Sequence, residues 1–562
     1  MYKSEARGWY MKSYKPVFTV LSMLVVLSLW AANSRAGTVT FTATDVPKVI
    51  YDNTTVTSTI TVSGLPAYIT NVTVTLTEIR HSADGELKFF LIGPVGTRIE
   101  LFTRQGGSGS NFIQTSLDDD APLNISSGTA PFTGDFRPLG LLAELDSENP
   151  NGNWTLEVTD TATGNTGVIN SWSLTISAGT PLDDWFIKQI STSSTDNGSV
   201  RIHGSNVVWE GRDATDWEIF LHNLNTGITS AITNNTQDDW CPQIFGSNVV
   251  WAHFDGSDME IFLYDTITRG TTQITDNTFD DVDPEVYGST ITWCAYDDGR
   301  YGKIFYYDIA SGITTKITNN SYIDGIFPQI YDSAIVWEAL TDQGREVMLY
   351  DVATQTTTQI TNNNYDDWYP HIHGPFVTWC GRFGDDSEVY LYNINTGATQ
   401  RITNNGTSDW CPFVYGSNIV WRRDDASDWE IFHYNVDTAI TTTVTDTSYD
   451  DLDPRISNSN VVWYQLDNSD SEIYLYNIIT KETLRVTDDS RVNTNPDVCG
   501  SKIVWESTEA GRTDIFVGFR KVCMSTMSAD LDGNCRIDMA DFAKWSLQWL
   551  NCDLQPPEAC WK

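Results

Sequence analysis

The chain has 562 residues, of which 40% are hydrophobic, so it is long enough for several globular domains with sizeable cores. Its 74 acidic and 34 basic residues give a net charge of −40, which disfavours binding to the phosphate backbone of nucleic acids. The same acidity favours cations and basic surfaces as partners, although it also confers solubility in a salty or extracellular setting.

Residues 1–36 have the pattern of a secretory signal peptide. Basic residues (Lys12, Lys15) precede an apolar run of 14 residues from Val17 to Trp30, and the small-residue segment 34–36 follows. Such a run is too short to span a bilayer as a helix and fits the apolar region of a signal peptide. An uncleaved anchor is the alternative. Because no later stretch is apolar enough to span a membrane, we expect a secreted, extracellular or cell-surface protein.

Residues 40–178 alternate apolar and polar positions in short runs such as Val72–Leu76 and Leu87–Leu91, separated by turn signals. This pattern is typical of an antiparallel β-sandwich. Four segments resemble the P domain of proprotein convertases, which implies a jelly-roll fold that stabilises or targets a neighbouring protease domain. The segments are HSADGELKFFLIGPVGTRIELF (81–102), SLDDDAP (116–122), PFTGDFRP (131–138) and NGNWTLEVTDTATGNTGVINSWSLTI (151–176).

The chain has no recognisable catalytic motif. It lacks a G-x-S-x-G elbow and any Ser, His and Asp set in a known context, and the segment Gly106–Ser110 has the composition of a flexible loop. We therefore predict no catalytic residues in the chain.

Residues 186–520 contain eight copies of one repeat. Each copy carries a tryptophan at the end of a short apolar run, with spacings of 42 residues and one of 44. A period of 40 to 45 residues with several β-type runs is the signature of a propeller blade. The repeats resemble TolB-like and related surface-protein propellers, which implies a ring mouth that binds protein or peptide partners. The tryptophans are Trp209, Trp251, Trp293, Trp337, Trp379, Trp421, Trp463 and Trp505.

The order of the predicted strands indicates how the ring closes. The first copy of the outermost strand precedes the first copy of the innermost one, and none follows the last repeat. The strand counts agree only if residues 186–191 complete the last blade, which would remove an exposed edge. The sequence thus predicts an eight-bladed propeller, with a seven-bladed ring as the alternative.

Connections alternate between the two faces of a four-stranded antiparallel blade, so the aspartate-rich loops should share one face with several aromatics. We predict that this face binds a protein or glycan ligand, because recognition sites combine apolar anchors with converging polar groups. The candidate residues are Trp217, Asp238, Asp239, Trp240, Asp366, Asp367, Trp368, His371, His373, Asp409, Trp410, Arg422, Arg423 and Trp429.

These candidates have a structural alternative. An aspartate repeated in every blade is commonly a turn former, and the loop tryptophans could wedge between blades. The repeated second-strand tryptophans should be core residues. His371 and His373 flank one residue on a strand and so point to the same side, but two histidines alone do not define a metal site. Cys241 and Cys411 occupy one repeat position four blades apart, so we expect buried free thiols.

Residues 523–562 form a cysteine-rich module with one acidic loop. The spacing of oxygen side chains from Asp530 matches a twelve-residue calcium-binding loop, and the apolar pattern at 542–550 fits the exiting helix of an EF-hand. The segment resembles one type I dockerin repeat, which implies docking to a cohesin, although Cys535 replaces the usual glycine and only one copy is present. The alternative is a disulfide-stapled tag. The predicted calcium ligands are Asp530, Asp532, Asn534, the Arg536 carbonyl, Asp538 and Asp541.

Taken together, these features favour a non-catalytic interaction or adhesion protein with a calcium-binding attachment tail. The alternatives are an extracellular polysaccharide lyase or hydrolase, or an accessory protein associated with a protease. An enzyme would need non-repeating charged residues that converge inside the channel, whereas a binding platform needs only its rim.

Overall fold

The structure is a computed structural model that describes residues 37–191, 196–296, 302–318, 324–384, 386–467 and 470–523. The described chain is mainly β, as predicted. The predicted signal peptide and the calcium-binding loop at 530–541 lie outside the described residues. Among the described residues, no helix is long and apolar enough to cross a membrane.

Two sheets pack face to face in the N-terminal sandwich, and the apolar residues of both form one buried cluster. The alternation of buried and exposed positions along strands such as β9 explains why each sheet presents one apolar face. One sheet contains β1 (Gly37–Thr42), β2 (Lys48–Ile50), β4 (Tyr68–His81), β7 (Phe112–Leu117), β8 (Phe132–Phe136) and β10 (Gly167–Gln189). The other contains β3 (Thr55–Val62), β9 (Gly152–Asp160), β5 (Leu87–Ile92) and β6 (Arg98–Thr103). Short 3-10 helices lie at η1 (Asp84–Glu86), η2 (Ile125–Ser127) and η3 (Leu142–Leu145).

The remaining strands form antiparallel four-stranded groups, one for each sequence repeat, and we number the repeats in chain order. Repeat 1 contains β11 (Asn197–His203), β12 (Asn206–Arg212), β13 (Trp217–Asn223) and β14 (Ile228–Ala231). Repeat 2 contains β15 (Asp239–Phe245), β16 (Asn248–Phe254), β17 (Met259–Asp265) and β18 (Gly270–Gln273). Repeat 3 contains β19 (Asp281–Tyr287), β20 (Thr290–Ala295), β21 (Lys303–Asp308) and β22 (Ile313–Lys316). Repeat 4 contains β23 (Asp324–Tyr331), β24 (Ala334–Thr341), β25 (Gly344–Asp351) and β26 (Thr356–Gln359).

The later repeats follow the same order of strands. Repeat 5 contains β27 (Asp367–His373), β28 (Phe376–Phe383), β29 (Asp386–Asn393) and β30 (Ala398–Arg401). Repeat 6 contains β31 (Asp409–Tyr415), β32 (Asn418–Asp424), β33 (Trp429–Asn435) and β34 (Ile440–Thr443). Repeat 7 contains β35 (Asp451–Ser457), β36 (Asn460–Asp467), β37 (Asp470–Asn477) and β38 (Thr483–Arg485). Repeat 8 contains β39 (Val492–Cys499), β40 (Lys502–Glu509) and β41 (Arg512–Cys523), and its fourth strand is supplied by β10.

The groups are arranged around a channel, which identifies a β-propeller. The first strand of each repeat contacts the first strand of the next, and β39 in turn contacts β11. Each second strand carries its repeated tryptophan in the core, where these eight side chains are at most 1% exposed. The tryptophans therefore hold neighbouring sheets together, as expected for the constant part of a repeat. The second strands run beyond the tryptophan, however, where the sequence had predicted that they end.

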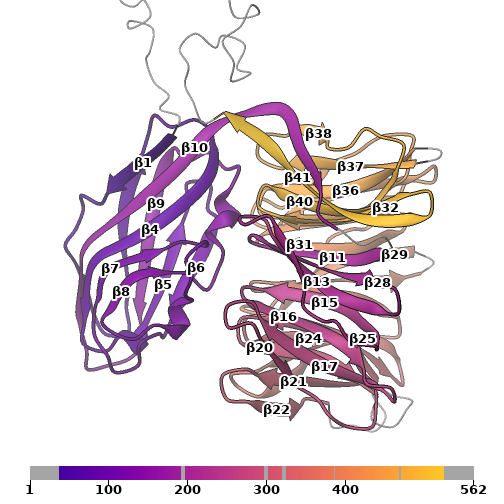
Figure 1. Ribbon diagram of the computed structural model, residues 1–562, viewed down its shortest axis with the longest axis horizontal. Coiled ribbons are helices and arrows are strands. Elements are labelled where there is room, and N and C mark those ends of the chain that lie inside the picture. The colour runs from indigo at the N-terminus through magenta and orange to yellow at the C-terminus, as the bar shows by residue number, and fades with distance from the viewer. Residues whose placement is uncertain are drawn as a thin grey trace, which may run out of the picture.

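Strand β10 belongs to both domains (Figure 1). Its first part pairs with β1, β2 and β4 in the sandwich, and its last part pairs with β41, with Phe186 opposite Phe519. The sequence predicted that residues 186–191 pair with the last repeat, and the strand does so through Gln189. The segment between 178 and 186, which the predicted domain bounds left unassigned, is part of the same 23-residue strand.

The sandwich lies against one face of the propeller (Figure 1). We call this the turn face, because it carries the short turns after the first and third strands of each repeat, and we call the opposite face the loop face. Around η3, Asp146 lies 3.6 Å from the Lys502 ammonium, and the Asn460 amide donates to the Ser147 hydroxyl at 3.0 Å. Leu141 packs against the apolar cluster of repeats 1 and 8. The loop face, which carries most of the predicted binding residues, is thus the face that the sandwich leaves uncovered.

Candidate functional site

Three predicted binding residues of the loop face are buried. Asp239, Asp367 and Asp409 are at most 3% exposed. One oxygen of each accepts a hydrogen bond of 2.6–2.9 Å from the indole Nε1 of the tryptophan twelve residues later. The other oxygen accepts from an asparagine amide at 2.7 Å. These aspartates cannot contact a ligand at the surface, so for them the prediction is corrected and the structural alternative holds.

The neighbouring candidates connect one repeat to the next. Asp238 accepts a hydrogen bond from the backbone of Trp217 at 3.0 Å, and Asp366 accepts one from the backbone of Arg345 at the same distance. Trp217 begins β13 and is half-buried. These aspartates tie the loop before one repeat to the third strand of the repeat before it. Half-buried Trp240 packs against the core of repeats 2 and 3 as a wedge.

Arg422, Arg423 and Trp429 form a small cluster in repeat 6. The Arg422 guanidinium lies 5.0 Å from the Trp429 ring centroid and 3.3 Å from a carboxylate oxygen of Asp453. The Arg423 Nε donates to the buried Asp409 at 2.7 Å. Arg423 therefore has a structural role, since it pairs with a buried aspartate, whereas Arg422 lies beside Asp453 at the rim of the channel.

Aromatic side chains gather at the loop-face mouth of the channel. Trp368 stacks on Trp410 with ring centroids 5.6 Å apart. Tyr369 lies 6.5 Å from Trp410 and 6.2 Å from Phe327, and both Tyr369 and Phe327 are nearly half exposed. Exposed aromatic clusters beside a cavity are typical of ligand-binding surfaces. Among the predicted residues, Trp368 and Trp410 are therefore brought together, with Tyr369 and Phe327 as partners that the sequence analysis missed.

A bulge in each first strand re-aims one side chain at this mouth. The bulged residue precedes the repeated proline position and has a positive φ, as in Cys241 (54°), Tyr369 (51°) and Cys411 (53°). Bulges of this kind change the direction of a side chain without ending a strand. Both cysteines are free thiols, but Cys241 is exposed and Cys411 half-buried, so the predicted burial is wrong for Cys241.

The sandwich lies over the turn-face end of the channel. A cavity of about 1380 Å³ reaches from the first strands to the sandwich segments 95–100 and 144–148. The cavity continues between the sandwich and the outer strands of repeats 6 and 7, where Ile440 and Ile479 line it. His203, Phe245, Tyr287, Tyr331, His373 and Tyr415 form a continuous run of neighbouring rings at this end, with successive centroids 4.1–4.6 Å apart. The cavity therefore reaches the surface both at the loop-face mouth, beside Phe327 and Tyr369, and beside the sandwich at Ile440 and Ile479.

His371 and His373 both point into the channel, which agrees with the prediction that they share one side of the strand. Their predicted place on the loop face is corrected for His373, whose ring lies between Tyr331 and Tyr415 at the sandwich end. The Nδ1 atoms accept hydrogen bonds from the backbone N–H groups of Val414 and Gly416 at 3.3 and 2.9 Å. Burial lowers the pKa of His373 to about 3 and that of His371 well below its ordinary value. Both rings are thus neutral with the proton on Nε2, and this tautomer presents no lone pair to a metal ion.

Glu285 is the channel residue best suited to take up or release a proton. Its carboxylate accepts hydrogen bonds from the side-chain amides of Gln243 and Gln329 at 3.2 and 3.1 Å. Burial raises its pKa to about 7, although the nearby positive charges of Arg201 and Arg455 oppose the shift. A carboxyl that titrates near neutral pH can exchange a proton with a bound ligand. The sequence signal was available, because the residue after the repeated proline position differs from repeat to repeat.

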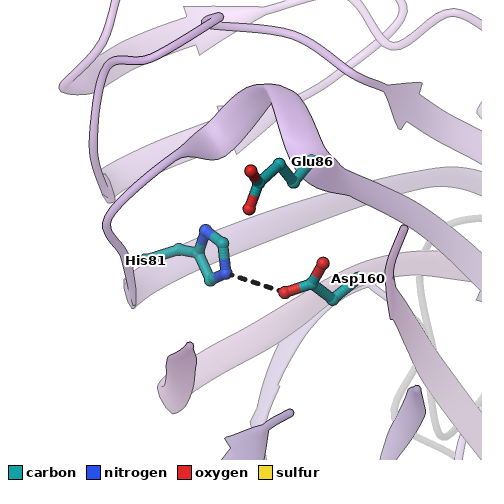
Figure 2. A group of neighbouring side chains, drawn as sticks. All are labelled: His81, Glu86 and Asp160. Atoms are coloured by element: carbon teal, nitrogen blue, oxygen red, sulfur yellow. Dashed lines mark hydrogen bonds and ion pairs between the residues drawn. The ribbon is translucent and has the colours of Figure 1, made fainter. Parts of the chain in front are cut away.

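A second cluster lies in the sandwich, away from the channel (Figure 2). His81, Glu86 and Asp160 place ligand atoms within 4.8 Å of one another, so they could hold a metal ion. The His81 Nε2 lies 3.1 Å from Asp160, and both side chains are fully buried. The Ala83 N–H lies 3.2 Å from His81 Nδ1, so a neutral histidine can accept there and donate to Asp160. The pair is satisfied without an ion, and the sequence analysis did not identify it.

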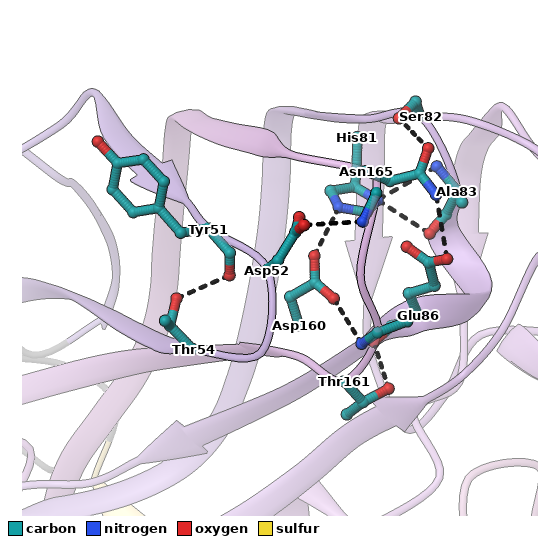
Figure 3. A network of polar contacts seen from close by, with 12 residues as sticks. Tyr51, Asp52, Thr54, His81, Ser82, Ala83, Glu86, Asp160, Thr161 and Asn165 are labelled. Carbon is teal, nitrogen blue, oxygen red and sulfur yellow. Dashed lines mark hydrogen bonds and ion pairs between the residues drawn. The ribbon is translucent and has the colours of Figure 1, made fainter.

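The surrounding contacts give this cluster a structural role (Figure 3). The Asn165 amide donates to Glu86 at 3.1 Å and its oxygen accepts from Ser82 at 2.8 Å. Thr161 donates to the Glu86 carbonyl at 2.8 Å, and Asp52 accepts from the backbone of Gly164 at 2.7 Å. The cluster therefore ties together three loops at one edge of the sandwich.

The fold and the channel define the protein as a β-sandwich joined through one strand to a β-propeller. Residues 69–176 match the family model of the proprotein convertase P-domain, so the prediction for the sandwich is confirmed. The chain is also 35% identical over 120 residues to leupeptin-inactivating enzyme 1 of Streptomyces exfoliatus. This match covers 21% of the chain and 22% of that enzyme, so the chain spans about a fifth of its relative's length.

Solved propeller structures are similar at low sequence identity. An oligogalacturonate lyase in complex with manganese is 13% identical, with a TM-score of 0.40 over 59% of this chain and 99% of that one. The propeller domain of the trilobed protease from Pyrococcus furiosus is 12% identical, with a TM-score of 0.41 over 52% of this chain and 98% of that one. Neither likeness extends to a function of this chain.

Proposed function

We propose that a jelly-roll P domain and an eight-bladed propeller together form an extracellular glycan-binding protein, whose ligand enters the channel from the loop face. The observation that carries this proposal is the aromatic cluster at the loop-face mouth, where exposed Tyr369 and Phe327 line the cavity and Tyr369 adjoins the half-buried stack of Trp368 and Trp410.

The residues below the mouth are suited to a sugar ligand. Gln243, Gln329 and Glu285 offer amide and carboxyl groups that can form hydrogen bonds with the hydroxyls of a sugar, and a few such polar groups beside aromatic side chains are typical of small-ligand pockets. The net charge of −40 favours a neutral or basic glycan over an acidic one. Secretion of the chain and attachment through a calcium-bound, dockerin-like tail remain part of this proposal.

The test is binding of purified full-length protein to a panel of soluble neutral, basic and acidic oligosaccharides, measured by calorimetry. We expect Tyr369→Ala and Trp410→Ala to weaken binding of the best ligand at least about tenfold, because stacked aromatic anchors carry much of the affinity. The matched control is Tyr449→Ala, which removes an exposed aromatic that does not line the channel. Unchanged affinity in both mouth variants contradicts the proposal, as does binding of peptides alone.

The second candidate is an enzyme that acts on the same ligand, and Glu285 is the observation that favours it. A buried carboxyl with a pKa near 7 between Arg201 and Arg455 is suited to general acid or base catalysis. Incubation with each bound glycan should then release shorter products, and Glu285→Gln should abolish the release while retaining affinity. Intact glycan after prolonged incubation supports binding without catalysis.

A further inference from the structure

Four repeats carry the acidic motif D-x-x-D-x-E at the corner between their second and third strands, on the loop face. They are repeats 1, 2, 6 and 7, and the copy in repeat 7 is Asp467, Asp470 and Glu472. In repeats 1, 2 and 6, ligand atoms of the three carboxylates lie within 4.8 Å of one another. These three clustered copies are Asp213, Asp216 and Glu218; Asp255, Asp258 and Glu260; and Asp425, Asp428 and Glu430.

The contacts in repeat 1 leave two carboxylate oxygens without a donor. One oxygen of Asp213 accepts from the backbone N–H of Asp216 at 3.1 Å, which forms the turn. One oxygen of Glu218 accepts from the backbone N–H of Asn235 at 2.6 Å. The second oxygens of Asp216 and Glu218 are buried and have no hydrogen-bond partner, and these side chains are 5% and 2% exposed.

Repeats 2 and 6 reproduce these contacts. The turn bonds measure 3.2 Å in both, and the glutamates accept from the backbone N–H groups of Asn277 and Thr447 at 2.6 and 2.5 Å. Again one oxygen of the second aspartate and one of the glutamate are buried without a partner, and Glu260 and Glu430 are at most 2% exposed. One oxygen is also buried without a partner at Glu346 and Glu388, the glutamates of repeats 4 and 5. What distinguishes repeats 1, 2 and 6 is the unpaired aspartate oxygen beside the unpaired glutamate oxygen.

Such an arrangement is unfavourable unless a cation compensates it. Burial of an unpaired carboxylate costs several kcal/mol, and like charges in contact add to that cost. In line with this, burial and neighbouring carboxylates raise the pKa values of Asp216 and Asp258, and burial raises that of Glu430 to about 7.

Other repeats supply the missing charge from the protein. Arg401 lies 2.6 Å from Glu388 in repeat 5, and Arg485 lies 2.8 Å from Glu472 in repeat 7. Glu388 and Glu472 occupy the position of Glu218 in their repeats. In repeats 1, 2 and 6 the position of the arginine is filled by Ala231, Gln273 and Thr443, which carry no charge. Repeat 7 has both the complete motif and the arginine, whereas the three clustered copies in repeats 1, 2 and 6 have no arginine at this position.

We propose that each of these three corners binds a calcium ion, through the unpaired oxygens of the second aspartate and the glutamate together with the first aspartate. Calcium accepts six to eight oxygen ligands in irregular geometry, including bidentate carboxylates and water. Magnesium requires a regular octahedron and keeps several waters, which fits three convergent carboxylates less well. The ions would hold the loop-face corners of three sheets in place without closing the channel mouth.

The test counts ions in the full-length protein after removal of metals by chelation. The parent carries Asp530→Ala, so that the predicted C-terminal loop does not contribute. Terbium(III), which resembles calcium in size and oxygen preference, is titrated by calorimetry and then displaced with calcium. We expect Glu218→Gln, Glu260→Gln and Glu430→Gln each to bind one ion fewer than the parent, and the triple variant three fewer.

The substitution keeps the shape of the side chain and an oxygen for the backbone N–H, so it changes mainly the charge. Glu388→Gln is the matched control, because its repeat supplies Arg401, and it should bind as many ions as the parent. Calcium should also raise the melting temperature of the parent more than that of each single variant. Equal ion counts in the parent and all three single variants overturn the proposal. The single variants test it even if the triple variant does not fold.

Discussion

The two faces of the propeller are stabilised in different ways. The turn face is covered by the sandwich, whose η3 segment contacts the turns and second strands of repeats 7 and 8. The loop face is stabilised from within, because each repeat places a buried aspartate or asparagine beneath its loops and bonds it to the core tryptophan, except repeat 4. A face that is held together internally can vary its outer side chains without losing the fold. The comparison therefore explains why the non-repeating aromatics and the acidic corners occur on the loop face.

The largest effect should come from removing the internal support. We expect Asp239→Ala to destabilise the propeller by about 3–5 kcal/mol, because Trp251, His253 and Asn235 all lose a buried acceptor. Asp238→Ala should cost only about 1 kcal/mol, since it removes one bond to a backbone N–H. Urea unfolding followed by tryptophan fluorescence measures both. Equal costs for the two adjacent aspartates would show that the loop face does not depend on the buried network.

Substitution of one glycine on the turn face should disrupt the contact between the propeller and the sandwich. Gly500 has a φ of +58°, and an added Cβ would overlap the Ala143 carbonyl of the sandwich. Gly416 occupies the same turn in repeat 6 with a φ of +53° and open space around it. We expect Gly416→Ala to cost about 1 kcal/mol from the left-handed backbone alone, and Gly500→Ala about 2–4 kcal/mol because the clash is added.

Limited proteolysis near residues 180–185 distinguishes these two variants. Gly500→Ala should be cleaved faster there than Gly416→Ala, because the sandwich no longer docks. If both variants are cleaved at the rate of the parent, docking does not depend on this contact.

A smaller effect is expected from pH. Burial raises the pKa of Asp146 and of Glu148 to about 7, although Lys502 favours the charged form of Asp146. In the unfolded chain these groups titrate near 4. Between about pH 4 and 7 the folded protein therefore binds more protons than the unfolded chain, and stability falls as pH rises through this window. The melting temperature should be a few degrees lower at pH 7.5 than at pH 5.

Burial raises the pKa of other acidic side chains as well, including Asp281 and Glu285 of the propeller. The contribution of Asp146 and Glu148 to the pH dependence of the melting temperature is the part that disappears in the double variant Asp146→Asn, Glu148→Gln. If the melting temperature of this variant falls between pH 5 and 7.5 as much as that of the parent, these two carboxyls do not cause the pH dependence.

Much of the fold could be predicted from the spacing of the tryptophans. The period located the repeats, and the surplus outer strand before the first repeat led to the pairing of β10 with β41. The burial of Asp239 was missed, although an aspartate or asparagine stands twelve residues before seven of the eight tryptophans. Aspartate is rarely buried without a partner, and its partner, an indole N–H, is easily overlooked because the rest of that side chain is apolar.

Contacts between the domains could not be predicted in the same way. The direction of the closing strand does place the sandwich at the turn face, because an outer strand begins there. The docking of η3 depends on side chains such as Leu141 and Asp146, which follow no repeat and have no local signal. The approach of Tyr369 to Phe327 likewise depends on the bulges, which turn these two residues of neighbouring first strands toward the channel.

Strand β10 also has a mechanical consequence. It is hydrogen-bonded to β4 in the sandwich and to β41 in the propeller, so the joint has no freely rotating linker. A force that pulls the two domains apart along the strand loads many ladder hydrogen bonds at the same time, whereas a force across the strand opens them one after another. The protein should therefore resist tension between its two domains best when the force acts along β10.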